Sequence, residues 1–247
     1  LYRSLVNDLN SLEEQPHTLF PPNSNVFYGF SKLVGYEAVR PPTVFDYYPE
    51  LTEYEPYGRL NVKYILTHSE PPLKDPALVL RHKGRVAIYE NKYAQPRSRL
   101  FYNYEVSADN QRVSKLTVAD MPKDKILLDE TPVGVGKTPF PPSEDSKLIV
   151  DEGNRVSFSV NSPRPALFVL TDTFYPGWKA YWNGSPTKVL RASHLMRAIA
   201  IPQGQGTVEF RFEPQSYQWG LRLTLLGFLI VLAYFALALA KDRKSRI

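Results

Sequence analysis

The stretch TVEFRFEPQSYQWGLRLTLLGFLIVLAYFALALA (207–240) combines the two patterns that decide the fold. Its first part, 207–214, alternates apolar and charged residues, which is typical of a half-buried β-strand. Its second part, 219–240, carries one charge, Arg222, near its start. A helix of this length rises about 33 Å at ~1.5 Å per residue, and the hydrocarbon core of a bilayer is about 30 Å thick. The stretch therefore predicts a strand followed by a transmembrane helix.

The flanks of the apolar segment favour a membrane span over its alternative, a buried helix of a large soluble protein. Tyr217 and Trp219 stand where an interfacial aromatic belt is expected. The tail KDRKSRI (241–247) holds four basic residues and one acid. By the positive-inside rule this tail is cytoplasmic, so residues 1–215 should lie on the outer face of the membrane.

Charge and composition narrow the classes of function. The tail accounts for +3 of the net charge of +5, so the remainder carries only +2 and shows no basic stripe that would favour nucleic-acid binding. The chain has no Cys, which excludes disulfides and thiolate metal sites. The content of 22 Pro and 16 Tyr fits short strands and turns better than a helical bundle.

Residues 147–214 read as a β-sandwich domain, because short strand-like runs recur there with turn signals between them. The strongest hairpin signal is Asn183-Gly184, since a type I′ turn needs positive φ at both central residues. The expected strands are 147–152, 155–160, 166–173, 179–183, 187–192, 195–202 and 207–214. The strand expected at 125–130, within the connecting segment 107–146, is a further candidate member.

Residues 1–106 read as a small, partly irregular α+β region with short antiparallel strands. Helices are expected at 2–14 and around 43–51. Strands are expected at 61–68, 77–82, 85–91 and 98–106, with a hairpin joining the second and third. The predicted fold class is thus mainly β: this region, then an antiparallel sandwich, then one C-terminal transmembrane helix.

The residue spacings in this sequence do not match those of common catalytic motifs. GVGKT (134–138) lacks the first glycine of a phosphate-binding P-loop and runs into Pro139, so it predicts a loop. The four histidines have no ligand-like spacing, and no nucleophile–base pair is evident. The acidic clusters read by default as solvated surface. The sequence therefore gives no catalytic residue, cofactor site or metal site.

The most specific stretch is TDTFYPGWKAYWNG (171–184), where aromatic residues follow a Pro-Gly turn. Exposed aromatic side chains there could stack on sugar rings, and the alternative is that one tryptophan anchors the sandwich core while the other caps an edge. Alternation places Trp178 and Trp182 on one face of the strand and Tyr181 on the other. The candidate glycan-binding residues are Asp172, Tyr175, Trp178 and Trp182.

Several segments together resemble YfhO-type bacterial membrane proteins. The segments DTFYPGWKAYWNG (172–184) and KVLRASHLMRAIAIPQGQGTVEFRFEPQS (188–216), followed by a single span, are similar to the C-terminal end of that family. Upstream, 25–41, 60–67 and 84–101 are similar to its outer-face segments, in the same order.

This resemblance implies a GT-C-like glycosyltransferase of the bacterial cytoplasmic membrane, with a polyprenyl-phosphate-linked sugar as donor and a cell-envelope glycan as acceptor. We expect the chain to be the C-terminal part of such a protein, in contact with the bilayer and with preceding spans. The catalytic acid of such enzymes lies in an early outer loop, so no catalytic residue transfers to this chain. The alternatives are a non-catalytic glycan- or protein-binding module anchored in the membrane, and a structural envelope protein.

Overall fold

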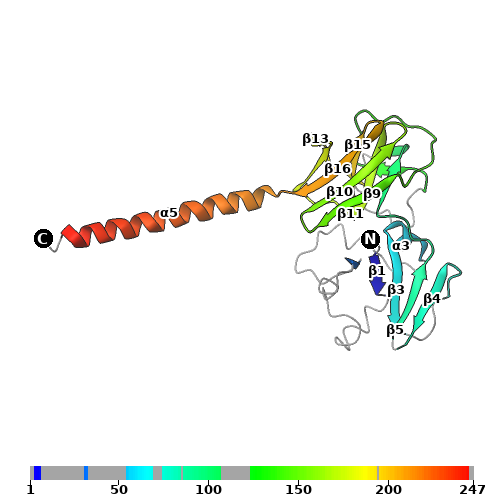
Figure 1. The fold of residues 1–247 in the computed structure, drawn as a ribbon, viewed down its shortest axis with the longest axis horizontal. Helices are drawn as coiled ribbons and strands as arrows, with labels where there is room; N and C mark the ends of the chain where they lie inside the picture. The colour runs from blue at the N-terminus through cyan, green and yellow to red at the C-terminus, as the bar shows by residue number, and fades with distance from the viewer. Residues whose placement is uncertain are drawn as a thin grey trace.

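The computed structural model shows a mainly β protein with one long C-terminal helix (Figure 1). It describes residues 3–6, 31–32, 54–68, 74–84, 86–106, 123–193 and 195–244. Within these residues the strands form three sheets, one in an N-terminal unit and two in a sandwich. The expected fold class is confirmed.

The N-terminal unit is a five-stranded sheet with one short helix, α3 (Glu55–Arg59), beside it. Its strand order is β2-β1-β3-β5-β4. The expected hairpin is confirmed, since β4 and β5 pair antiparallel. The strands are β1 (Arg3–Val6), β2 (Ser31–Lys32), β3 (Val62–His68), β4 (Leu78–Lys83) and β5 (Val86–Asn91).

The helix expected at 2–14 is wrong where the structure describes it. Residues 3–6 form a strand that pairs parallel to β3, with Ser4 opposite Tyr64. The apolar spacing of so short a segment fits either conformation, and pairing with a distant strand decides between them. The helix expected around 43–51 lies outside the described residues.

The sandwich consists of a five-stranded and a six-stranded sheet, and its pairs are antiparallel except β7–β8. The five-stranded sheet has the order β13-β12-β16-β10-β9, with strands β9 (Ser146–Glu152), β10 (Arg155–Ser162), β12 (Trp178–Trp182), β13 (Ser185–Thr187) and β16 (Gly204–Phe212). The six-stranded sheet has the order β6-β11-β15-β14-β8-β7, with strands β6 (Ser98–Phe101), β7 (Tyr104–Val106), β8 (Ile126–Leu128), β11 (Ala166–Thr173), β14 (Leu190–Ala192) and β15 (Met196–Ile201).

Sheet membership differs from the expected assignment at 98–106. These residues were assigned to the N-terminal region, but they form β6 and β7 of the six-stranded sheet, where Phe101 lies opposite Leu167. Strand β8 belongs to the same sheet, as the candidate strand at 125–130 suggested. Alternation identifies a strand, but it carries no information on which distant strand will pair with it.

Two hydrophobic clusters lie on opposite faces of the six-stranded sheet. Between the two sheets of the sandwich, the ring of Phe168 lies 5.2 Å from that of Phe158 and 6.3 Å from that of Phe210. On the other face, residues such as Val169 join Leu60 and Ile65 of the N-terminal unit in one buried cluster. Strand β11 is therefore buried on both faces, which explains its continuous apolar run.

Two local predictions are confirmed. Asn183 and Gly184 have φ of 49° and 80°, as a type I′ turn between β12 and β13 requires. GVGKT (134–138) is a loop without a following helix, which is incompatible with a P-loop. Val135 is buried, and Thr138 N–H donates to the Tyr102 carbonyl at 2.9 Å, so this loop packs on the sandwich.

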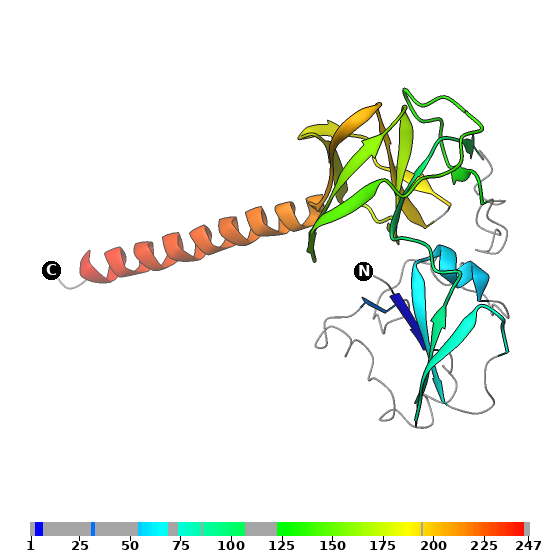
Figure 2. The same ribbon diagram turned by 45° about the vertical axis from the view of Figure 1, so that its right-hand side comes forward.

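Helix α5 (Gln215–Lys244) follows β16 after two residues and extends away from both β units (Figure 2). Its part Gln215–Ala236 is the one helix within the described residues that is long and apolar enough to cross a membrane. None of this part is buried in the structure. Its large apolar side chains are therefore not shielded from water by the β-domains. The first residues of the expected basic tail, 241–244, continue the helix.

Candidate functional site

An open groove of about 280 Å³ lies where β12 begins, and we call it the aromatic groove. It is formed by the loop before β12, by β12 itself and by the segment around β13. Its lining residues are Phe174, Tyr175, Pro176, Gly177, Trp178, Lys179, Ala180, Tyr181, Pro186, Thr187 and Val189.

The loop that forms the groove is fixed against the residues just before α5. Gly177 has φ of 110°, a conformation that favours glycine. A Cβ at this position would also lie 3.1 Å from the Cα of Pro214, so the close approach needs glycine. Glu213 N–H donates to the Gly177 carbonyl at 2.7 Å. The groove therefore lies next to the start of the long apolar helix.

Two of the four predicted site residues, Tyr175 and Trp178, line this groove. Tyr175 is 48% exposed, and its ring centroid lies 6.3 Å from that of Phe212. Trp178 is half-buried, with its ring 5.3 Å from Phe212 and the Arg197 guanidinium 3.8 Å from its centroid. These contacts hold Trp178 in one orientation, while Tyr175 presents much of its ring to solvent.

Asp172 is not a lining residue of the groove. Its carboxylate accepts hydrogen bonds from two arginines. Oδ1 accepts from Arg97 Nε at 3.0 Å, and Oδ2 accepts from Arg97 Nη2 at 2.7 Å and from Arg197 Nη2 at 2.9 Å. Arg97 also pairs with Asp151 of β9 in the opposite sheet at 2.8 Å. Burial alone would lower the pKa of Arg97, but these two carboxylates raise it above its ordinary value. Asp172 therefore has a structural role in linking the strands.

Trp182 is the last residue of β12 and is not a lining residue of the groove. It covers Gly206, where a Cβ would come 2.5 Å from the Trp182 Cη2 atom. Trp178 and Trp182 both pack against the cluster between the two sheets, so the predicted common face is confirmed. The structure thus brings Tyr175 and Trp178 together, and it places Asp172 and Trp182 elsewhere.

The described lining of the groove is mainly aromatic and apolar, with one cationic side chain. It contains aromatic rings, the hydroxyls of Tyr175, Tyr181 and Thr187, and one cation. The cation is Lys179, whose Nζ pairs with Glu213 at 2.8 Å. None of the described residues that line the groove carries a carboxylate or an imidazole. Within the part of the chain that the structure describes, no group of three or more His, Cys, Asp or Glu side chains could hold a metal ion.

Sequence reasoning missed part of the lining. Tyr181 was expected on the face opposite Trp178, but the groove reaches round the strand and includes both. Pro186 and Val189 come from the segment after the hairpin turn, and only the turn at Asn183-Gly184 signalled that this segment folds back.

Comparison with known proteins adds no relative: no family model, curated protein or solved structure matches this chain.

Proposed function

We propose that this chain is a membrane-anchored β-sandwich module that binds glycan in the aromatic groove. The observation that carries the proposal is the groove itself, with Tyr175, Trp178 and Tyr181 around an open space that carboxylates do not line. Aromatic faces suit the apolar C–H faces of sugar rings, and the Tyr hydroxyls can exchange hydrogen bonds with sugar hydroxyls.

The position of the groove supports a ligand at the membrane surface. The Gly177 carbonyl is hydrogen-bonded to Glu213, and the apolar helix begins two residues later. If this helix crosses the membrane, the groove lies close to the bilayer surface. A membrane-attached envelope glycan would then be within reach without leaving the bilayer.

The larger protein in this proposal is a GT-C-like transferase that moves sugar from a polyprenyl-phosphate carrier to an envelope acceptor in the bacterial cytoplasmic membrane. Its support is the ordered set of sequence segments that resemble YfhO-type proteins. The module would hold the acceptor glycan. The base that deprotonates the acceptor hydroxyl would then come from outside the described lining, which contains no Asp, Glu or His.

Glycan binding is expected to depend on Tyr175. With the full chain in detergent micelles, titration with tetramers of N-acetylglucosamine and of glucose should give a saturable change in tryptophan fluorescence, because Trp178 lines the groove. Tyr175→Ala should weaken binding at least about tenfold, the effect of losing about 1.4 kcal/mol of contact energy.

Tyr64→Ala is the matched control, since Tyr64 is 39% exposed on β3 and does not line the groove. It should bind as the unchanged chain does. Absence of a saturable response in the unchanged chain, or equal loss in both variants, would contradict glycan binding at this groove.

The proposed orientation predicts opposite outcomes for two reporters in the native membrane. A fluorescent protein fused after Ile247 should fold and fluoresce, because the basic residues of the tail retain it in the cytoplasm. Alkaline phosphatase, which is active only outside the cytoplasm, should be active when inserted near residue 110. A dark C-terminal fusion together with an inactive phosphatase would show that the chain is inverted.

A further inference from the structure

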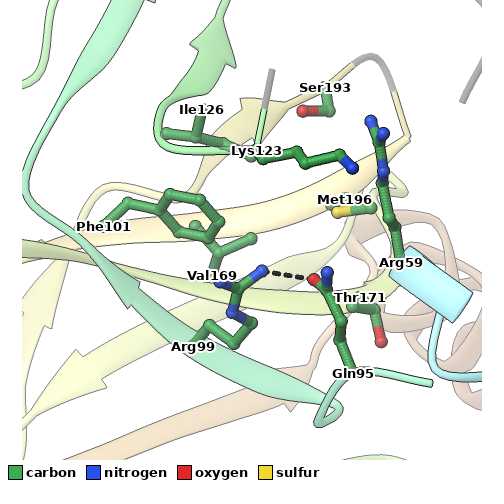
Figure 3. Close-up of a pocket in the computed structure, with 10 residues that line it drawn as sticks. All are labelled: Arg59, Gln95, Arg99, Phe101, Lys123, Ile126, Val169, Thr171, Ser193 and Met196. Atoms are coloured by element: carbon green, nitrogen blue, oxygen red, sulfur yellow. Dashed lines mark hydrogen bonds between the residues drawn. The ribbon is translucent and has the colours of Figure 1, made fainter. Parts of the chain in front are cut away.

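A second cavity, of about 40 Å³, lies where the N-terminal unit meets the six-stranded sheet (Figure 3). One water position needs about 10–15 Å³ measured in this way, so the cavity has room for about three water-sized groups, comparable to the oxygens of a small oxyanion. We call it the basic cavity. Its lining residues are Arg59, Gln95, Arg99, Phe101, Lys123, Ile126, Val169, Thr171, Ser193 and Met196.

Three of these side chains are cationic and none is acidic. Arg59 comes from α3, Arg99 from β6 and Lys123 from the segment before β8, so the charges reach the cavity from three separate segments (Figure 3). Two of these cations share one carboxylate. Glu55 Oε2 lies 2.9 Å from Arg59 Nη2, and Glu55 Oε1 lies 3.3 Å from Lys123 Nζ. Among the described side chains that line the cavity or pair with its cations, positive charges therefore outnumber negative ones.

Arg99 is the member of the group without a carboxylate partner in the part of the chain that the structure describes. Its guanidinium contacts the Gln95 side-chain oxygen and lies 5.0 Å from the centroid of the Phe101 ring. Its Nε–H is buried, with no hydrogen-bond acceptor among the described residues. Burial lowers the pKa of Arg99, and the distant charge of Glu144 offsets this only in part. Arg99 is half-buried, and a partly desolvated cation without a carboxylate partner among the described residues favours an anion beside it.

We propose that the basic cavity binds a phosphate group. A free phosphate or phosphate monoester carries about −1.5 to −2 charge at pH 7 and a phosphodiester carries a single negative charge, both opposite in sign to the excess charge at the cavity, and the oxygens can accept hydrogen bonds from several directions. The guanidinium of Arg99 and the flexible Lys123 ammonium belong to lining side chains and supply donors, and the Ser193 hydroxyl adds a neutral one. Arginine favours oxyanions that accept two parallel hydrogen bonds.

The bound phosphate would connect the two β units, because its partners come from both. The site is separate from the aromatic groove and shares no lining residue with it. The inference does not depend on the proposed glycan binding, and either can fail alone. The phosphate could belong to free inorganic phosphate or to a phosphodiester of a lipid or polymer.

The test measures the thermal unfolding midpoint of the full chain in neutral detergent at increasing concentrations of sodium phosphate. Sodium chloride keeps the ionic strength constant. A saturable rise is expected for phosphate and sulfate, and a much smaller one for acetate, which carries one charge and only two oxygens for the three cationic side chains. Arg99→Gln should weaken the phosphate effect about tenfold or more, as loss of a charge-assisted hydrogen bond does. Arg99→Lys, which keeps the charge, should retain part of it.

Arg164→Gln is the matched control. Arg164 also lies over a phenylalanine, 4.3 Å from the centroid of Phe140, and has a buried Nε–H without an acceptor in the described part of the chain, but it does not line the cavity. This variant should respond to phosphate as the unchanged chain does. No saturable response in the unchanged chain, or an equal loss in Arg99→Gln and Arg164→Gln, would overturn the proposal.

A second arm identifies the source of the phosphate. The unfolding midpoint of the chain reconstituted in phosphatidylcholine vesicles is the reference. It is compared with the midpoint after addition of phosphate or glycerol-3-phosphate to these vesicles, and with the midpoint of the chain in phosphatidylglycerol vesicles. Stabilisation by the soluble phosphates in neutral vesicles, lost in Arg99→Gln, supports a soluble or polymer phosphate. Stabilisation by phosphatidylglycerol alone, again lost in that variant, supports a lipid headgroup, and a vesicle effect that persists in Arg99→Gln counts against the cavity as the site.

Discussion

Asp172→Asn is expected to lower the free energy of unfolding by about 3 kcal/mol, within the range found when a buried ion pair loses one partner. The substitution keeps the size of the side chain and removes its charge. Arg197, whose side chain is 3% exposed, would then lose the carboxylate to which its Nη2 donates at 2.9 Å. Arg97 would keep only Asp151. The expected change is large because two guanidinium groups share this one carboxylate.

The measurement is thermal unfolding of the full chain in detergent, followed by near-ultraviolet circular dichroism of the aromatic core. About 3 kcal/mol corresponds to a fall in midpoint of about 6–12 °C for a chain of this size. The Trp178 signal should change as well, because Arg197 lies 3.8 Å from the centroid of its ring and is held there by Asp172.

Asp151→Asn provides the control, since it removes the other carboxylate that contacts Arg97. The Asp151 side chain is 28% exposed and pairs with this one arginine, so its loss should cost less than about 1 kcal/mol. If the two variants unfold at the same temperature, the Asp172 network does not contribute as the structure indicates, and Asp172 regains its place as a candidate ligand-binding group.

The parts of the fold that sequence could predict are those set by neighbouring residues. Alternation in 207–214 gave β16, where Val208 and Phe210 are fully buried. The need for positive φ at Asn183-Gly184 gave the hairpin of β12 and β13. Periodicity and turn chemistry act over a few residues, so they are visible without a structure.

The parts that sequence could not predict depend on pairing between distant residues. Strand β1 pairs with β3 across about 60 positions of the chain, with Arg3 opposite Val62. Strand β6 joins the sandwich because Phe101 meets Leu167. In both cases the local pattern fits several partners, and burial in the assembled core selects one.

The difference between local and distant contacts also explains why the sequence indicates the aromatic groove and not the basic cavity. Most of the aromatic groove comes from one segment, 174–181, so its aromatic density is visible in the sequence. The basic cavity gathers Arg59, Arg99 and Lys123 from three segments, and no local pattern announces it. The structural role of Asp172 is not visible in the sequence, because its arginine partners are 75 and 25 positions away.

Gly58 packs closely against the backbone of Tyr93, in the segment that leads from the N-terminal unit to the sandwich. Gly58→Ala is expected to destabilise the chain by about 2 kcal/mol, although alanine is the better helix former. Gly58 lies in α3, where alanine would gain about 1 kcal/mol from helix propensity. A Cβ there would lie 2.6 Å from the carbonyl carbon of Tyr93 and 2.8 Å from its Cβ, and even closer to its carbonyl oxygen.

The neighbouring backbone has little freedom to move aside. The Gly58 carbonyl accepts from Gln95 N–H at 2.9 Å and from Asn61 N–H at 3.0 Å, which fixes both sides of the contact. Overpacking of this kind costs typically about 1–3 kcal/mol, and the upper end applies when backbone must shift. The cost therefore exceeds the propensity gain, and the unfolding midpoint should fall by about 4–8 °C.

Gly153→Ala separates this contact from the general effect of replacing glycine. Gly153 lies in the turn between β9 and β10, and a Cβ there would have no atom within 4 Å. Its substitution should leave the midpoint within about 1–2 °C, as expected for a surface change below ~0.5 kcal/mol. A rise in the midpoint of Gly58→Ala would mean that helix propensity outweighs packing, and that α3 does not press on the Tyr93–Gln95 segment. Because Gln95 also contacts Arg99, a fall in the midpoint should be accompanied by weaker phosphate stabilisation at the basic cavity.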